Sequence, residues 1–141
     1  MSENHTDHAT QQLVQAAIKA AQNAYVPYSN FPVGAALRTT DGTVYTGCNV
    51  ENAAYPATIC AERTALVKAV SEGDRTFDAL AVTTNSGGFP CGICRQMLYE
   101  FAPDLRVIVA MPDGQVLYDL PLNELLAHGF GPKELAPDAS R

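Results

Sequence analysis

The sequence predicts an α/β protein, a three-layer α/β/α sandwich built on a mixed five-stranded sheet. Between residues 43 and 111, short β-rich apolar runs alternate with amphipathic helical patterns, an order that places helices on the faces of a sheet. Asp41-Gly42 is a turn pair whose second residue tolerates positive φ, which predicts an antiparallel hairpin. Pro112-Asp113-Gly114 is too short for a parallel crossover, so it also joins antiparallel strands. Crossovers and hairpins together make the predicted sheet mixed.

The first part of the chain is expected to form a helix, a loop and a hairpin. Apolar residues recur with helical spacing in an alanine-rich segment, which predicts a helix near residues 10–24. Pro27 and Pro32 exclude a continuing helix, so we expect an ordered surface loop there. Residues 33–39 and 43–48 then supply the two strands of the hairpin.

The second part of the chain alternates helices and strands. Thr58 is the candidate N-cap of a helix that stops at Gly73, and Pro90 fits the start of the next helix. The other expected elements are buried strands at 77–84 and 105–111, a strand at 115–119 and a short last helix at 122–128.

Length and composition indicate one domain. The chain has 141 residues, of which 47% are hydrophobic and 17% charged, enough apolar material for a core and too little charge for a disordered chain. We expect a single domain over residues 10–131, a flexible N-terminal tail over 1–9 and a C-terminal tail over 132–141.

Charge and targeting signals limit the partners and the location. The net charge of −6 disfavours binding to nucleic acid. No stretch approaches the roughly 18 apolar residues of a membrane span, and the N-terminus lacks the basic start and apolar run of a secretion signal. We therefore expect a cytoplasmic protein with no membrane partner. In that reducing compartment, the four cysteines are interpreted first as metal ligands or catalytic groups.

Three of the cysteines have the spacing of a metal site. Cys91 and Cys94 lie three residues apart, which on a helix places both sulfurs within about 60° of one face. Alone, this pair also fits a redox dithiol or two core cysteines. Cys60 supplies a third thiol, and open-site zinc enzymes use three protein ligands with water in the fourth position. Cys48 would complete a closed four-sulfur structural site, but it ends an apolar strand and is better explained as a small buried side chain.

Helix geometry predicts where the metal lies. Residues 60 and 62 point about 200° apart on a helix, so Cys60 and Glu62 cannot both face an ion beside it. The ion is therefore expected off the helix ends, where unpaired N–H groups favour thiolate. Three thiolates leave zinc with a net charge of about −1, for which Arg63 and Arg95 are candidate counterions. Glu62 is the candidate proton carrier; without the cysteines it would be a solvated glutamate in the first turn of a helix.

Several strings of residues match a known enzyme family. Cys60-Ala61-Glu62 and Pro90-Cys91-Gly92-Ile93-Cys94 fit the three-cysteine form of the zinc deaminase signature. Further matching strings are residues 28–37 (YSNFPVGAAL), 47–52 (GCNVEN), 59–65 (ICAERTA) and 94–96 (CRQ). Together they resemble the small homotetrameric zinc-dependent cytidine deaminases over residues 12–135.

The resemblance implies a reaction and a cofactor. It implies one Zn²⁺ per subunit and hydrolytic deamination of cytidine and deoxycytidine to uridine and deoxyuridine plus ammonia, a step of pyrimidine salvage. Zinc would activate a water for attack on C4 of the base. Glu62 would protonate N3 and later help ammonia leave.

The resemblance also implies a set of substrate contacts. Asn49 and Glu51 correspond to the residues that bind the 3′-hydroxyl of the sugar, and two such side chains in an extended segment project to one side. Phe31 corresponds to the phenylalanine against the pyrimidine, and Ala61 to the residue whose backbone meets the base. Without the resemblance, Asn49 and Glu51 would be interpreted as turn and capping residues, and Phe31 as a plug at the edge of the core.

Two further residues are implied to act across a subunit interface. Phe130, and also Tyr55, match residues that reach a neighbouring subunit's site in a tetramer with shared active sites. The chain departs from the family at Phe89, where a small hydroxyl residue is usual, and at Ala127, where proline is usual. Neither is a metal ligand, so the departures concern loop shape and the preference for analogues.

Three alternatives remain at this point. The nearest is a deaminase of the same chemistry that acts on a cytosine-like nucleoside analogue or antibiotic. A non-catalytic zinc-stabilised module would have a closed four-sulfur site, and a thiol oxidoreductase built on Cys91 and Cys94 would need no zinc.

Overall fold

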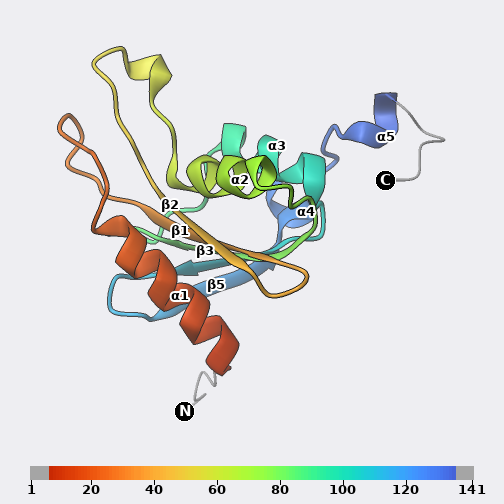
Figure 1. Cartoon of the computed structure of the whole chain (residues 1–141), viewed down its shortest axis with the longest axis horizontal. Helices are drawn as coiled ribbons and strands as arrows, with labels where there is room; N and C mark the ends of the chain where they lie inside the picture. Colours follow the sequence, from red (N-terminus) through yellow and green to blue (C-terminus); the bar gives the residue numbers. More distant parts are fainter. Residues whose placement is uncertain (1–6, 136–141) are drawn as a thin grey trace.

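The protein is a three-layer α/β/α sandwich, as the sequence predicts. The computed structural model describes residues 7–135. A five-stranded sheet with the order β2-β1-β3-β4-β5 lies between α1 on one face and α2 and α3 on the other (Figure 1). The elements are α1 His8–Ala21, β1 Gly34–Thr39, β2 Val44–Cys48, the short 3-10 helix η1 Tyr55–Ala57, α2 Ala61–Ser71, β3 Phe77–Thr83, α3 Gly92–Phe101, β4 Arg106–Ala110, β5 Val116–Pro121, α4 Leu122–Leu125 and α5 Pro132–Leu135.

Strand pairing confirms the mixed sheet. β1 and β2 form the predicted antiparallel hairpin, with Gly34 opposite Cys48, and β1 also pairs antiparallel with β3. β3 and β4, which are joined through α3, are parallel, and β5 returns antiparallel to β4 after the predicted turn. The carboxyl end of β3 therefore leads directly into the segment that carries Cys91 and Cys94.

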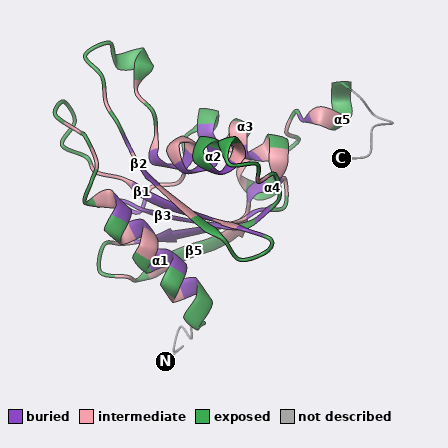
Figure 2. Cartoon of the chain, viewed as in Figure 1, coloured by how far each residue is buried: buried purple, intermediate pink, exposed green. Residues whose placement is uncertain are grey.

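Each face of the sheet has its own apolar core, because alternate residues of a strand point to opposite faces. Leu80 and Val82 of β3 pack toward α2 and α3, whereas Ala79 and Ala81 of the same strand pack under α1. The sheet face under α1 is lined mainly by small alanines, and the face under α2 and α3 by larger aliphatic residues. Figure 2 shows the buried residues concentrated in the strands and on the helix faces turned toward them.

Helices extend into both of the predicted tails. The predicted tail of residues 1–9 is too long, because α1 begins at His8 and Asp7 caps it by accepting a hydrogen bond from the backbone N–H of Thr10 at 2.7 Å. At the other end, α5 lies within the predicted tail 132–141. The outermost residues of both predicted tails, 1–6 and 136–141, lie outside the described part of the chain.

The predicted last helix is much shorter than expected. α4 makes one turn and stops at Leu125, because Leu126 has an extended backbone (φ −133°) and His128 a left-handed one (φ 55°). Neither conformation continues a right-handed helix. Residues 126–131 therefore form an irregular segment between α4 and α5.

The predicted helix caps at Thr58 and Pro90 are also displaced. α2 begins after Cys60 and α3 begins after Cys91, and these two cysteines occupy the N-cap positions with extended backbones. Thr58 instead ends η1, and its neighbour Ile59 pairs with Val50 through two backbone hydrogen bonds. Both helices thus begin at a metal-ligand candidate.

A glycine allows α2 to lie close to the sheet. A Cβ placed on Gly47 of β2 would lie 2.6 Å from the carbonyl oxygen of Ala61 and 2.6 Å from the backbone nitrogen of Ala65, closer than real Cβ contacts allow. Thr64, between them in the first turns of α2, donates from its hydroxyl to the carbonyl oxygen of Cys48 at 3.0 Å. The first turn of α2, and with it Cys60, is therefore held at a fixed distance from β2.

Within residues 7–135, none of the helices has the length and apolar character needed to span a bilayer.

Candidate metal centre

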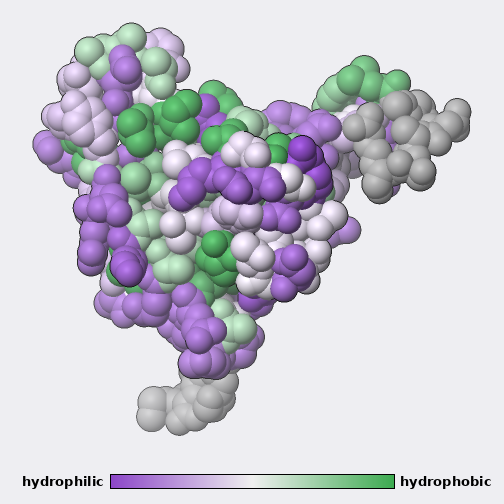
Figure 3. Space-filling model, viewed as in Figure 1, coloured by the Kyte–Doolittle hydropathy of each residue, from purple (hydrophilic) through white to green (hydrophobic). Residues whose placement is uncertain are grey.

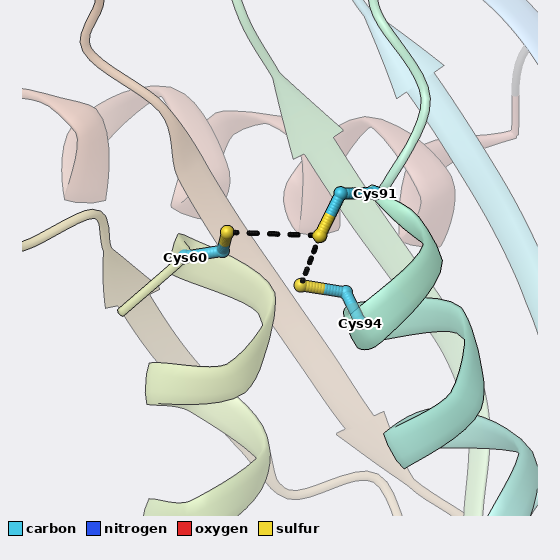
Figure 4. Close-up of side chains that lie close together, drawn as sticks. All are labelled: Cys60, Cys91 and Cys94. Carbon is cyan, nitrogen blue, oxygen red and sulfur yellow. Dashed lines mark hydrogen bonds between the residues drawn. The ribbon is translucent and has the colours of Figure 1, made fainter. Parts of the chain in front are cut away.

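Three thiols from two helix N-termini meet at one point. The sulfur of Cys60 lies 3.8 Å from that of Cys91, and Cys91 lies 3.5 Å from Cys94 (Figure 4). All three sulfurs lie within 4.8 Å of one another. Sulfurs that bind one zinc ion at about 2.3 Å in a tetrahedron lie about 3.8 Å apart, so the observed spacing fits a shared zinc ion.

The helix starts favour thiolate at this point. Cys60 and Cys91 are N-cap residues whose side chains make no capping hydrogen bond, so their sulfurs are free to bind an ion. Cys94 lies one turn into α3 and points back toward the same end (Figure 4). The positive ends of two helix dipoles and the unpaired first-turn N–H groups stabilise negative charge there. The three sulfurs thus lie at the helix N-termini, where the sequence predicts the ion.

Burial is graded across the cluster. Cys94 is buried, Cys60 is half-buried and Cys91 is exposed, so solvent reaches the cluster from the Cys91 side. Cys48 is half-buried rather than fully buried, and it does not belong to the cluster. Three thiols with access from one side suit an open zinc site and not a closed four-sulfur one.

The guanidinium group of Arg63 contacts one of the three candidate metal ligands. Its Nη2 donates to the sulfur of Cys60 at 3.4 Å and to the carbonyl oxygen of Thr58 at 3.3 Å. Hydrogen bonds from Cys94 first, and then from Arg63, lower the pKa of the Cys60 thiol to about 5. The same interaction with Cys60, together with burial, raises the pKa of Cys94, so in the metal-free protein Cys60 ionises first.

Arg95 has a different environment from the one expected. Instead of facing a sulfur, its Nε donates to the carbonyl oxygen of Pro90 at 2.7 Å and its Nη1 to that of Leu125 at 2.7 Å. Arg95 thereby ties the residue before Cys91 to the end of α4.

Glu62 is buried in the first turn of α2. Its side chain is 4% exposed, and burial raises its pKa to about 7. A carboxyl group that titrates near neutral pH can both accept and release a proton, which suits general acid and base catalysis. The solvated first-turn glutamate considered from the sequence is therefore wrong.

Asn49 and Glu51 hold the loop before β1. The Asn49 side chain accepts from the backbone N–H of Val33 at 2.9 Å and donates to the carbonyl oxygen of Phe31 at 2.8 Å. Glu51 accepts from the backbone N–H groups of Tyr28 and Ser29, at 3.0 and 3.1 Å, through one carboxylate oxygen. Hydrogen bonds from Ser29 and Tyr28 lower the pKa of Glu51, so it is a carboxylate at neutral pH. One carboxylate oxygen and one amide hydrogen remain for a ligand.

The other candidate substrate contacts occupy varied positions. Ala61 is fully buried, and its backbone N–H, in the first turn of α2, lacks an intrahelical acceptor. Phe31 is partly exposed in the loop that Asn49 holds. Tyr55 of η1 is 70% exposed and meets the ring of Tyr28 edge-on, and Phe130 is 55% exposed. Tyr55 and Phe130 are thus available to a second molecule.

Two features of the site have no counterpart among the sequence predictions. Thr84, at the end of β3, accepts from the backbone N–H groups of Ser86 and Gly88 and so shapes the loop that leads to Cys91. A threonine followed by Asn-Ser-Gly-Gly is a turn signal that indicates such bonds. Phe89 packs on Tyr118 of β5 with ring centroids 4.7 Å apart, a contact between residues distant in sequence.

An α/β/α sandwich with three thiols at two helix starts, next to a buried glutamate, defines a zinc-dependent deaminase class of site. The comparisons with known proteins agree. The family described as the cytidine and deoxycytidylate deaminase zinc-binding region matches residues 7–111. The chain is 46% identical over 128 residues to a cytidine deaminase of Halalkalibacterium halodurans, covering 89% of this chain and 96% of that one. It is 58% identical over 93 residues to one of Sporosarcina psychrophila, covering 64% and 68%.

A solved structure agrees over nearly the whole fold. The crystal structure of cytidine deaminase from Burkholderia pseudomallei superposes with a TM-score of 0.82 at 45% identity, covering 89% of this chain and 100% of that one. The chain therefore belongs to the zinc-binding cytidine and deoxycytidylate deaminase family.

Proposed function

We propose that the protein catalyses the zinc-dependent hydrolytic deamination of cytidine and deoxycytidine to uridine and deoxyuridine plus ammonia. The observation that carries this proposal is a buried Glu62 whose carboxyl group interacts with Cys60 and Cys94, two of three thiols that fit one zinc ion. The relatives named cytidine deaminase, from Halalkalibacterium halodurans and Burkholderia pseudomallei, support the choice of substrate.

Each residue of the metal centre has a role in this reaction. Cys60, Cys91 and Cys94 would hold the zinc, which when bound activates water for attack on C4 of the base. Glu62 carries the protons, first to N3 of the ring and then to the departing amine, which its pKa of about 7 permits. Arg63 offsets the negative charge of the thiolates through its bond to Cys60.

The nucleoside is held by the loop and the start of α2. We assign Asn49 and Glu51 to the 3′-hydroxyl, since each retains a free hydrogen-bonding group beside those used by the loop. Phe31 packs against the pyrimidine, and the backbone of Ala61 contacts the base. Because Asn49 also anchors the backbone on both sides of Pro32, sugar binding and the position of Phe31 are linked.

We further propose a homotetramer with shared active sites. η1, which carries Tyr55, and α5, which follows the segment with Phe130, lie on two sides of the molecule away from the sheet (Figure 1). The side chains of Tyr55 and Phe130 are both largely exposed. Apolar surface is visible near α2 and at α5 (Figure 3). The exposed apolar residues of these parts of the chain include Ile59 before α2, Val67 within it and Leu135 at the end of α5. Such surface indicates a protein interface.

The remaining expectations concern partners and location. A net charge of −6 supports a free nucleoside rather than nucleic acid as the partner. Three free thiols that bind a metal persist in a reducing compartment, which supports a cytoplasmic location.

An ultraviolet assay of cytidine with the zinc-loaded protein tests the proposed reaction. Wild type should convert cytidine and deoxycytidine. Glu62→Gln should keep its zinc and lose turnover by roughly 10²–10⁴-fold or more, because the proton carrier is removed. Glu100→Gln, an exposed position on α3, is the matched control and should resemble wild type.

The same assay separates the alternatives. No turnover of either nucleoside by the zinc-loaded wild type would contradict the reaction, and a near-normal rate for Glu62→Gln would remove Glu62 from it. Deamination of free cytosine as efficiently as cytidine would contradict the sugar contacts of Asn49 and Glu51. Turnover of a cytosine-like analogue in strong preference to cytidine would favour the analogue deaminase.

A further inference from the structure

The segment after α4 is fastened to α3 by side chains of that helix. Nε2 of Gln96 donates to the carbonyl oxygen of Phe130 at 2.8 Å. The ring of Tyr99 lies against the backbone on both sides of Phe130: a Cβ on Gly129 would lie 2.8 Å from its Cζ, and one on Gly131 would lie 3.1 Å from its Cε1. We call Gln96, Tyr99, Gly129 and Gly131 the Phe130 clamp.

The clamp fixes the backbone of Phe130 and leaves its side chain outside the core. Phe130 is 55% exposed although its carbonyl is bonded and both its neighbours pack on a ring. The chain enters the clamp through His128, a non-glycine residue in the left-handed region at φ 55°. Such a conformation costs free energy and persists when surrounding contacts hold it in place.

A fixed backbone under an exposed aromatic side chain is a pre-organised binding element. Ordering a free segment at the moment of binding costs conformational entropy, and a segment already held avoids that cost. The exposed ring is not part of the core, so it is free to contact a second molecule.

We propose that Gln96 is a positioning residue for the active site of a second copy of this chain, acting by directing Phe130 into that site. The proposal rests on the proposed function, in which active sites are shared and Phe130 reaches the site of a neighbouring subunit. Gln96 touches neither the substrate nor the zinc in this arrangement. Gln96 follows Cys94 by two residues on α3. The same helix therefore carries a metal-ligand candidate of its own active site and the residue that anchors Phe130 for the neighbouring subunit's site.

Loss of the Gln96 bond has a defined kinetic signature. Replacing this exposed residue removes one hydrogen bond to a backbone carbonyl that water can then satisfy, so folding is preserved. A less ordered Phe130 weakens its contact with the bound nucleoside in the ground state and the transition state alike. Gln96→Ala should therefore raise KM for cytidine about three- to tenfold at unchanged kcat.

A double-mutant cycle tests the proposal on the zinc-loaded enzyme. The variants are Gln96→Ala, Phe130→Ala and the double variant, with Gln12→Ala, an exposed glutamine on α1 at the opposite face of the sheet, as the matched control. Kinetics are measured with cytidine, together with zinc content and sedimentation. Gln96→Ala should raise KM in the wild-type background and have no further effect when Phe130 is already alanine, with zinc and assembly unchanged.

The other outcomes overturn the proposal in distinguishable ways. A KM that rises in Phe130→Ala but not in Gln96→Ala refutes the role of Gln96 and leaves the proposed function intact. Additive effects, or loss of zinc or of assembly in Gln96→Ala, show that Gln96 acts by another route. Wild-type kinetics in Phe130→Ala refute the shared-site role of Phe130 and the clamp with it, whereas deamination itself is judged by turnover of the wild type.

Discussion

Replacing Gly47 of β2 by alanine is expected to disturb the metal centre by pushing α2, the helix that Cys60 caps, away from β2. The added methyl group would lie 2.6 Å from backbone atoms of Ala61 and Ala65, whereas an ordinary contact begins near 3.4 Å. α2 must therefore move by about 0.8 Å away from β2, and overpacking of this kind costs about 1–3 kcal/mol. Cys60 caps α2 and moves with it, while Cys91 and Cys94 stay on α3.

The displacement is large compared with the tolerance of a zinc site. Zinc-ligand distances vary by about 0.2 Å, so a shift of about 0.8 Å in one of three sulfurs should weaken zinc binding roughly 10–100-fold. Competition with a chromophoric chelator measures the affinity, and urea unfolding measures the stability. Gly92→Ala is the control: it adds a methyl group between Cys91 and Cys94, with no atom within 4 Å, and should bind zinc normally. Wild-type zinc affinity and stability in Gly47→Ala would refute the reasoning.

Two further predictions concern the thiols and Glu62. Cys94→Ser should lose zinc and thermal stability together, whereas Cys48→Ser should retain about one zinc per chain by metal analysis; equal losses would place Cys48 in the site. In the zinc-free protein, the folded-state pKa of Glu62, about 7, lies above the ordinary glutamate value of 4.5, so the folded chain holds more protons between those values. Cys60, whose lowered pKa has the opposite effect on stability in this range, titrates in both proteins. The free energy of unfolding of wild type should therefore fall by about 3 kcal/mol relative to that of Glu62→Gln as pH rises from about 4.5 to 7, as urea titrations of the two proteins would show. Parallel pH profiles of the two proteins would contradict the burial of an ionisable Glu62.

The order of elements follows from the sequence because its periodic patterns are strong. Turn residues at Asp41-Gly42 and at Pro112-Asp113-Gly114 predict both antiparallel connections, and the structure confirms them. The helix starts were less predictable: Thr58 and Pro90 are good N-terminal residues by type, yet the helices begin at Cys60 and Cys91. Cysteine is a weak cap, so propensity alone does not place a helix start there.

The candidate site shows the same division between local and long-range information. The sequence predicts a cluster of Cys60, Cys91 and Cys94, which the structure contains. Cys91 and Cys94 lie three residues apart at the start of one helix, so their proximity is a local property, and an open zinc site requires a third protein ligand. The hydrogen bonds of Asn49 and Arg95 to distant backbone groups depend on the tertiary fold, which local patterns do not encode. The close approach behind Gly47 is equally non-local, although a glycine inside a strand signals it.

X-ray absorption at the zinc edge of the purified wild-type protein tests the central claim most directly. Three thiols that hold one zinc ion with an open corner should give three sulfur neighbours at about 2.3 Å and one light oxygen neighbour. A shell of four sulfurs, or a zinc ion bound through nitrogen, would contradict the open three-cysteine site from which the proposed reaction is argued.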